Sequence, residues 1–378
     1  MKTVPWKIII VSALSLTALY LRFDALAGRE LWNDENYQRD AVLFPDGKLK
    51  KFWLNSPHKD IAAAGGNSSF IKAPYGDFSA FPGDYLLVFP AIKMFGTNKW
   101  AMAMGHILAT VFGLYLLYKL CGRLLKTIWG YVVTFLIVCF NSNLIFHAFE
   151  LRPYAVLPTL AIGAVYFSYR VVEDYDRLSL LKKALIALFF FCGINFHAYG
   201  LMIFALAFGF VYLAKNGGRV FELFRSSYRN YVVSIFFAAA VVWWWYASVN
   251  FSGASPSSGV GYRNTFQFIP DPASSLGGFA KGIVGNLLGN RIFYIFLPVA
   301  GLAFLWNHSQ RVQQLLFFIL LVVLPIGLIL WVDIRTDYWF VQRQFVWVMP
   351  LFAVWVGWCV DSVIAHMIKK QAIKKQGC

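Results

Sequence analysis

The chain has 378 residues, of which 59% are hydrophobic and only 14% are charged. Because a soluble domain carries about a quarter charged residues, this composition excludes an ordinary soluble enzyme and predicts a single all-α helix bundle in a membrane. The formal net charge is +16, but the basic residues lie in short gaps between apolar runs, which argues against nucleic-acid binding.

In chain order, the apolar runs predict about ten transmembrane helices, since a span needs roughly 20 residues. The first run is interpreted as a retained span, because no small-residue cleavage site of a signal peptide follows it. The division between the fifth and sixth runs falls inside one long apolar stretch, at NFHAYG. The expected segments are 5–22, 99–119, 128–146, 153–170, 184–197, 198–214, 231–250, 290–306, 313–332 and 344–366.

Lysine and arginine in the short loops indicate that both termini are cytoplasmic, including a basic tail at about 367–378. Two long loops then lie on the outer side, at about 22–98 and about 251–289. The first of them contains FPGDYLLVFPAIKMFG, which is apolar but too short to span. We expect an interfacial or re-entrant helix there, within one transmembrane domain over residues 1–378.

Four stretches with polar and aromatic residues stand out against this apolar background. They read LRFDALAGRELWNDENY, FPGDYLLVFPAIKMFGTNKWAMAM, FELRPYAV and QRQFVWVMPLFAVWVG. In this order they resemble the GT-C membrane glycosyltransferases, in the glycosyltransferase family 39-like branch of protein O-mannosyltransferases and the lipid A aminoarabinose transferase. The resemblance extends from residue 15 to about 215 and again from 340 onward.

The chain departs from the family pattern at three points. The usual proline pair is reduced to Pro82, and Leu151 replaces an alanine in the E-A-R-P-Y-A element. Gln344 and Phe345 stand where an Arg-Tyr pair is common. The order of the four stretches nevertheless agrees with the family.

The resemblance implies an inverting transfer of a sugar from a polyprenyl-phosphate donor to a glycan, lipid or protein acceptor. The reaction would take place on the outer face of the cytoplasmic (inner) membrane. By carry-over, Asp34 is the catalytic base, and Glu35 orients it or holds the first loop. Glu150 is a second carboxylate, which binds the acceptor, pairs with Arg152 or helps to hold a divalent cation. Relatives differ in their use of a metal, so a divalent cation stays an open possibility.

The departing lipid phosphate needs cations, and three basic residues are candidates. Arg152 and Arg343 lie where the fourth and last spans meet the outer interface, a position where a charge is costly enough to indicate function. Lys72 in the first loop is the third candidate. The alternatives are snorkelling of the two arginines to the surface and simple solvation of the lysine.

Other side chains at the outer ends of the spans are candidates for the same site. His147 lies three residues before Glu150, so on a helix the two share a face, which suits a phosphate or a metal. We expect Tyr154 at the phosphate and Tyr85, His197 and Tyr199 at the substrate. Each of them has an alternative use as a packing residue or a membrane-interface aromatic.

Two other functions share some of these features. A membrane polymerase or translocator of lipid-linked glycans also has many spans, large outer loops and arginines for phosphate, but a translocator needs no base. The acidic pair Asp34 and Glu35 therefore favours a glycosyltransferase. An ion-coupled transporter would place acids in mid-span, and the sequence has almost none.

Overall fold

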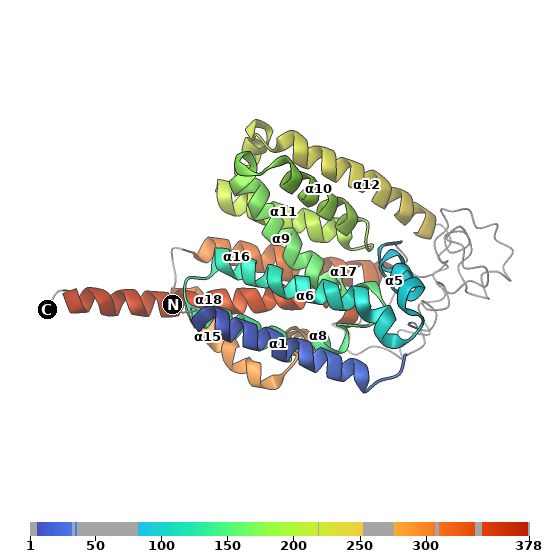
Figure 1. Ribbon diagram of the computed structural model, residues 1–378. Coiled ribbons are helices and arrows are strands. Elements are labelled where there is room, and N and C mark those ends of the chain that lie inside the picture. The colour runs from blue at the N-terminus through green and yellow to red at the C-terminus, as the bar shows by residue number, and fades with distance from the viewer. Residues whose placement is uncertain are drawn as a thin grey trace, which may run out of the picture.

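The computed structural model describes residues 6–31, 35, 82–217, 219–251, 276–306, 310–336 and 342–376. Throughout these ranges the secondary structure is helical, without a strand, as predicted. Figure 1 shows the beginning of α1 and the projecting end of α18 at one end of the bundle, and α5 and α8 toward the other. That second end, called the α5 end below, carries the candidate site.

Each of the ten expected segments contains a helix. In order, these are α1 (Trp6–Ala27), α6 (Lys99–Leu124), α7 (Ile128–Phe140) with α8 (Ser142–Phe146), α9 (Leu157–Asp174), α10 (Leu180–Ile194), α11 (Gly200–Asn216), α12 (Arg229–Phe251), α15 (Phe296–Trp306), α16 (Arg311–Phe318) with α17 (Leu324–Thr336), and α18 (Val348–Gln376). A π-helical turn, η6 (Ile319–Val323), joins α16 to α17.

Fewer helices than ten are long and apolar enough to cross a membrane by themselves. Within the described ranges there are four, at 6–27, 99–124, 311–331 and 348–371, and a pair bent by 106° at 280–303 would make a fifth. Several expected spans consist of shorter helices that are broken near one end, as at α7 and α8. The chain is therefore a multi-pass membrane protein, and the number of about ten spans stays a prediction.

The second outer loop differs from the prediction, because α14 (Leu276–Leu288) occupies its last part. The sequence LGGFAKGIVGNLL has four glycines among 13 residues, and such a composition is typical of loops. In the structure α14 packs against α18, and this tertiary contact overrides the weak local helix propensity. By contrast, the helix expected at FPGDYLLVFPAIKMFG is present as α5 (Pro82–Phe95).

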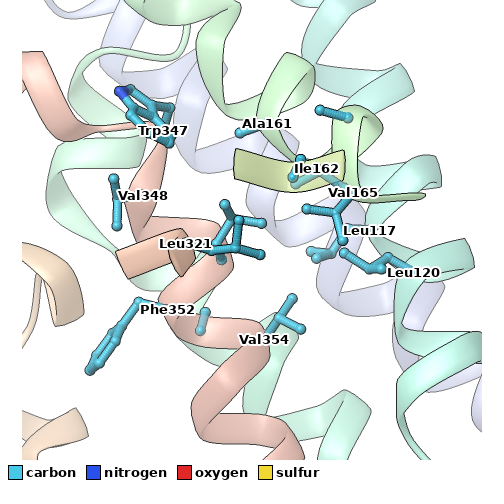
Figure 2. Close-up of a cluster of buried hydrophobic side chains, with 14 of the residues drawn as sticks. Leu117, Leu120, Ala161, Ile162, Val165, Leu321, Trp347, Val348, Phe352 and Val354 are labelled. Atoms are coloured by element: carbon cyan, nitrogen blue, oxygen red, sulfur yellow. The ribbon is translucent and has the colours of Figure 1, made fainter. Parts of the chain in front are cut away.

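The centre of the bundle is an apolar cluster in which α6, α9, η6 and α18 meet. Figure 2 shows its side chains, including Leu117, Val165, Leu321 and Val354, which interdigitate between these helices. Trp347, directly before α18, is 1% exposed, and its indole N–H donates to the backbone oxygen of Gln344. Burial of so large a ring fixes the chain that leads into α18 and, with it, the position of Arg343 nearby.

The closest helix packing is the seam between α7 and α18. A Cβ atom at Gly357 would collide with the Thr134 side chain, so only glycine permits this approach of the two helices. At the end of the seam, the buried Asp361 carboxylate accepts hydrogen bonds from the backbone N–H groups of Lys126 (2.8 Å) and Thr127 (2.6 Å). It also accepts one from the Thr127 hydroxyl (2.6 Å). Asp361 thus caps α7, which has no side-chain cap of its own.

Candidate active site

The site is built on the irregular segment between α8 and α9, residues 147–156, which reads HAFELRPYAV. Asn141 ends α7, caps α8 through the backbone N–H of Leu144 (3.0 Å), and donates from its amide to the backbone oxygen of Leu287 at the end of α14 (3.0 Å). Asn143 donates to the side-chain oxygen of Asn286 on the same helix (2.9 Å). The helix break is therefore held in place by two amide side chains.

This segment brings several polar side chains into the protein interior. His147 is 5% exposed, Glu150 1% and Arg152 8%, and Tyr154 is buried beside them in the 3-10 helix η1 (Pro153–Ala155). Buried charges are stable only when other charges or hydrogen bonds compensate them. The arrangement of their partners therefore determines what the site can bind.

Glu150 is the electrostatic centre of the segment. Its Oε2 lies 2.5 Å from Nδ1 of His147. Burial alone would raise the pKa of the Glu150 carboxyl, but His147, Arg343 and Arg152 together reverse this and hold the pKa below its usual range. Glu150 is therefore a carboxylate at neutral pH, and two arginines act on it.

The two arginines reach Glu150 from distant parts of the chain. Arg152 directly precedes η1, which ends at Ala155, and Arg343 lies in the 3-10 helix η7 (Gln342–Phe345), which begins 187 residues after that end. Both side chains are buried, at 8% and 7% exposed. The fold therefore gathers two permanent positive charges and one carboxylate at a single place.

Aromatic rings form the next layer of the site. The Arg343 guanidinium lies over the Tyr154 ring, 5.4 Å from its centroid. The His197 ring lies 5.4 Å from Tyr154 and 4.8 Å from Tyr199, in the turn between α10 and α11. Nδ1 of His197 accepts the backbone N–H of Tyr199 (3.1 Å), which fixes the orientation of that imidazole. Tyr154 thus connects the arginine cluster to the NFHAYG turn.

Glu35 ties the first loop to this segment. Its carboxylate accepts two hydrogen bonds from the Arg29 guanidinium, at 2.6 and 2.8 Å. It also accepts the backbone N–H of Leu151 (2.9 Å), the residue between Glu150 and Arg152. The Glu35 side chain is 0% exposed, so this bidentate pair holds residue 35 against the site segment.

Helix α5 covers another side of the same segment. Val88 and Ile92 of α5 pack with Met102 and Leu151 in one apolar cluster. Near the beginning of α5, Gly83 touches Phe196, and a Cβ atom there would collide with the Phe196 backbone and ring. The helix thus contacts the neighbours in sequence of Glu150, Arg152 and His197.

Sequence reasoning missed the pair that fixes α5. Oδ1 of Asp84 lies 2.8 Å from Nε2 of His106 on α6, and both side chains are almost completely buried. It also missed Arg29, the partner of Glu35. A signal for His106 was present in the sequence, because an ionisable residue within an expected span is a functional or structural candidate by default.

Arg22, the arginine at the end of the first span, lies elsewhere. It is 4% exposed and donates to the backbone oxygens of Ala18 (2.8 Å) and Val138 (2.9 Å). It lines a small, mainly apolar cavity of about 40 Å³, together with Ala148 and Thr159. Its contacts connect α1 to the end of α7.

The structure therefore brings together His147, Glu150, Arg152, Tyr154, His197, Tyr199 and Arg343, with Glu35 bound to the backbone beside them. Two expected residues, Asp34 and Lys72, lie outside the residues that the structure describes. Tyr85 lies on α5, but its side chain is also outside the described part. Among the described side chains, no group of three or more His, Cys, Asp or Glu could hold a metal ion, so a cation at Glu150 and His147 would find two ligands there.

Comparison with known proteins gives one match in this region. Residues 83–246 match the family described as dolichyl-phosphate-mannose-protein mannosyltransferase. The matched range includes α5, the HAFELRPYAV segment and the NFHAYG turn, but neither the first loop nor Arg343. Comparisons with curated proteins and with solved structures gave no match.

Proposed function

We propose that this chain, whose residues 83–246 match the family described as dolichyl-phosphate-mannose-protein mannosyltransferase, is a glycosyltransferase of that kind. It would transfer a sugar with inversion to an acceptor on the outer face of the cytoplasmic membrane. Members of this family are glycosyltransferases that use a lipid-phosphate sugar as donor, and the proposed donor of this chain is of the same kind. The acceptor is a surface glycan, a lipid or a protein.

One observation carries the proposal for the site: Arg152 and Arg343 both act on the buried carboxylate of Glu150. A guanidinium has five N–H donors in a fixed fork, so one that contacts a carboxylate retains donors for phosphate oxygens. In a buried environment such donors stabilise the charge that develops on a departing phosphate more strongly than they would in water. We therefore assign the donor phosphate to these two arginines.

The base remains the carboxylate of Asp34. This assignment rests on the family resemblance of the W-x-D-E element, which reads Trp32, Asn33, Asp34 and Glu35. The contact of Glu35, the other acid of that element, with the backbone of Leu151 supports it. Glu35 already accepts three hydrogen bonds, so its proposed role is to hold the first loop.

The outer location follows from the expected orientation of the chain. The candidate site lies toward the α5 end of the bundle, away from the projecting end of α18 (Figure 1). If both termini are cytoplasmic, the site faces outward. Cysteines introduced at positions 60 and 376, in a background without native cysteines, should react with an impermeant reagent from opposite sides. Reaction of both from the same side would contradict this location.

A membrane polymerase or translocator of lipid-linked glycans remains the alternative. Purified protein in nanodiscs should release polyprenyl phosphate from polyprenyl-phosphate mannose, the donor named by the family, when an acceptor is supplied. A panel of other polyprenyl-phosphate sugars extends the assay, and peptides, lipid A and glycans serve as acceptors. Movement of the lipid-linked sugar across a liposome membrane, without release of polyprenyl phosphate from any donor, would instead support a translocator.

A further inference from the structure

One nitrogen of the His147 ring is unusual among the polar atoms of the site. Nε2 of His147 is buried and has no hydrogen-bond partner, although its ring is only 5% exposed. Buried polar atoms are nearly always paired in folded proteins, so an exception calls for a reason. Because the same ring is held by the carboxylate on which Arg152 and Arg343 act, a ligand oxygen is expected at this nitrogen.

The other nitrogen of the same ring is firmly held. Nδ1 lies 2.5 Å from Oε2 of Glu150, and Glu150 is a carboxylate because its pKa lies below the usual range. The carboxylate therefore accepts the Nδ1 proton, and Nε2 becomes the nitrogen that can exchange a proton with a ligand.

The proposed reaction creates a need for such a proton. In the donor, the phosphate joins the sugar to the lipid and carries one negative charge. When the bond from the anomeric carbon breaks, the phosphate oxygen keeps the electron pair, and the product is a phosphate monoester with a second pKa of about 6. The arginines stabilise this charge, but they do not release protons, because their pKa is above 12.

We propose that His147, held by Glu150, donates a proton from Nε2 to the oxygen of the departing lipid phosphate. The proposal rests on the function proposed above. In the balanced step, the acceptor oxygen forms a bond to the anomeric carbon and loses its proton to the base. The bond between the anomeric carbon and the phosphate oxygen breaks, and that oxygen receives the proton of His147. Water then restores both residues to their starting protonation states. Glu150 is a positioning residue in this step.

A change of the leaving group tests the proposal. His147→Gln keeps an amide that can hydrogen-bond but cannot transfer a proton. With the polyprenyl-phosphate donor that wild-type protein uses, single-turnover transfer should fall by about a hundredfold or more, since general acid catalysis contributes typically 10² to 10⁴-fold. With the matching phosphorothioate donor, whose leaving group is a weaker base, the loss should be clearly smaller. The control is His366→Gln, which changes an exposed histidine in α18 and should have no effect.

The outcomes distinguish the two proposals. If His147→Gln loses the same factor of transfer rate with both donors, His147 only binds phosphate. If it loses none, His147 has no role in the site. Either result overturns the proposed proton transfer. Absence of transfer by wild-type protein from every donor would instead contradict the proposed function.

A second measurement does not depend on turnover. When polyprenyl phosphate binds near neutral pH, calorimetry in two buffers of different ionisation enthalpy gives the number of protons taken up. The net number of protons taken up should be smaller for His147→Gln than for wild-type protein and His366→Gln, because only a protein with the His147 imidazole can hold a proton between Nε2 and the bound phosphate. Equal uptake by all three proteins would contradict a role of His147 in proton transfer.

Discussion

Two buried carboxylates at different places in the bundle show how a structural acid differs from a candidate functional one. Asp361 and Glu150 are each 1% exposed. Both oxygens of Asp361 accept hydrogen bonds from Lys126 and Thr127, the two residues directly before α7. Glu150 has one oxygen on His147, while its Oε1 is buried without a hydrogen-bond partner.

The difference follows from what surrounds each acid. A helix N-terminus supplies fixed N–H donors that satisfy a carboxylate completely and leave nothing for a ligand. Around Glu150 the compensation comes from charges on long side chains and an imidazole. Such groups can turn toward a new anion, so the cluster can accept a ligand that the seam between α7 and α18 cannot.

The largest effect is expected at the proposed base. Asp34→Asn keeps the size of the side chain but removes the basic carboxylate, so transfer should fall by about 10² to 10⁴-fold while donor binding persists. Single-turnover transfer and donor binding, measured in parallel, test this. Glu35→Gln should have a smaller effect, since Glu35 is proposed to hold the loop. Near-normal transfer by Asp34→Asn would contradict the proposed mechanism.

A somewhat smaller loss is expected at the arginines. Arg343→Ala or Arg152→Ala should weaken binding of the polyprenyl-phosphate sugar by about 2 to 5 kcal/mol, because each removes a buried charged contact. Lysine should rescue binding only in part, as it lacks the bidentate fork. The control is Arg219→Ala, which removes an exposed ion pair with Glu222. Normal donor binding by both arginine variants would place the phosphate elsewhere.

Asp361 should show the opposite behaviour. Asp361→Ala leaves the backbone N–H groups of Lys126 and Thr127, directly before α7, without their acceptor and should destabilise the protein by about 2 kcal/mol. The thermal unfolding midpoint in detergent should fall, while transfer per folded molecule stays near that of wild type. The unfolding midpoint of Asp361→Asn, which keeps one acceptor oxygen, should lie between those of wild type and Asp361→Ala. A loss of transfer with unchanged stability would mean that Asp361 takes part in the reaction and is not a purely structural acid.

The smallest effect concerns the acid sensitivity of folding. Because the pKa of Glu150 is lowered in the folded protein, its stabilising effect is complete above its ordinary value of 4.5 and is lost as the pH falls through the folded value. Glu150→Gln should remove this part of the pH dependence. Unfolding midpoints of the two proteins from neutral to acid pH test the prediction, and parallel curves would contradict it.

The extent of sequence prediction can be judged from particular elements. The sequence predicts the helix at FPGDYLLVFPAIKMFG because this run is apolar but too short to span, and α5 is found there. It does not predict α14, because the glycines of α14 are typical of a loop and its stability depends on packing against α18. A sequence pattern thus identifies a helix whose stability depends on its own residues, but not one whose stability depends on packing against a distant helix.

The same distinction applies to the site. Glu150, Arg152 and Tyr154 are predictable together because they are close in sequence, and the resemblance of the separate stretch QRQFVWVMPLFAVWVG to the family's last span adds Arg343 as a hypothesis. The contacts of Glu35 with Arg29 and Leu151, and of Asp84 with His106, were not foreseen. They depend on how α5 and the first loop pack against the bundle, and no sequence spacing encodes that.

The sequence by itself determined that this is a helical membrane protein, where its apolar segments lie, and which family it resembles, because hydrophobicity, periodicity and short motifs are properties of neighbouring residues. Only the tertiary structure decided that Arg152 and Arg343 act on one carboxylate, that Nδ1 of His147 is held by Glu150, and that Asp361 is saturated by a helix end. Such partnerships join residues far apart in the chain, and the protonation and ligand capacity of a buried group depend on which partners the packing brings to it.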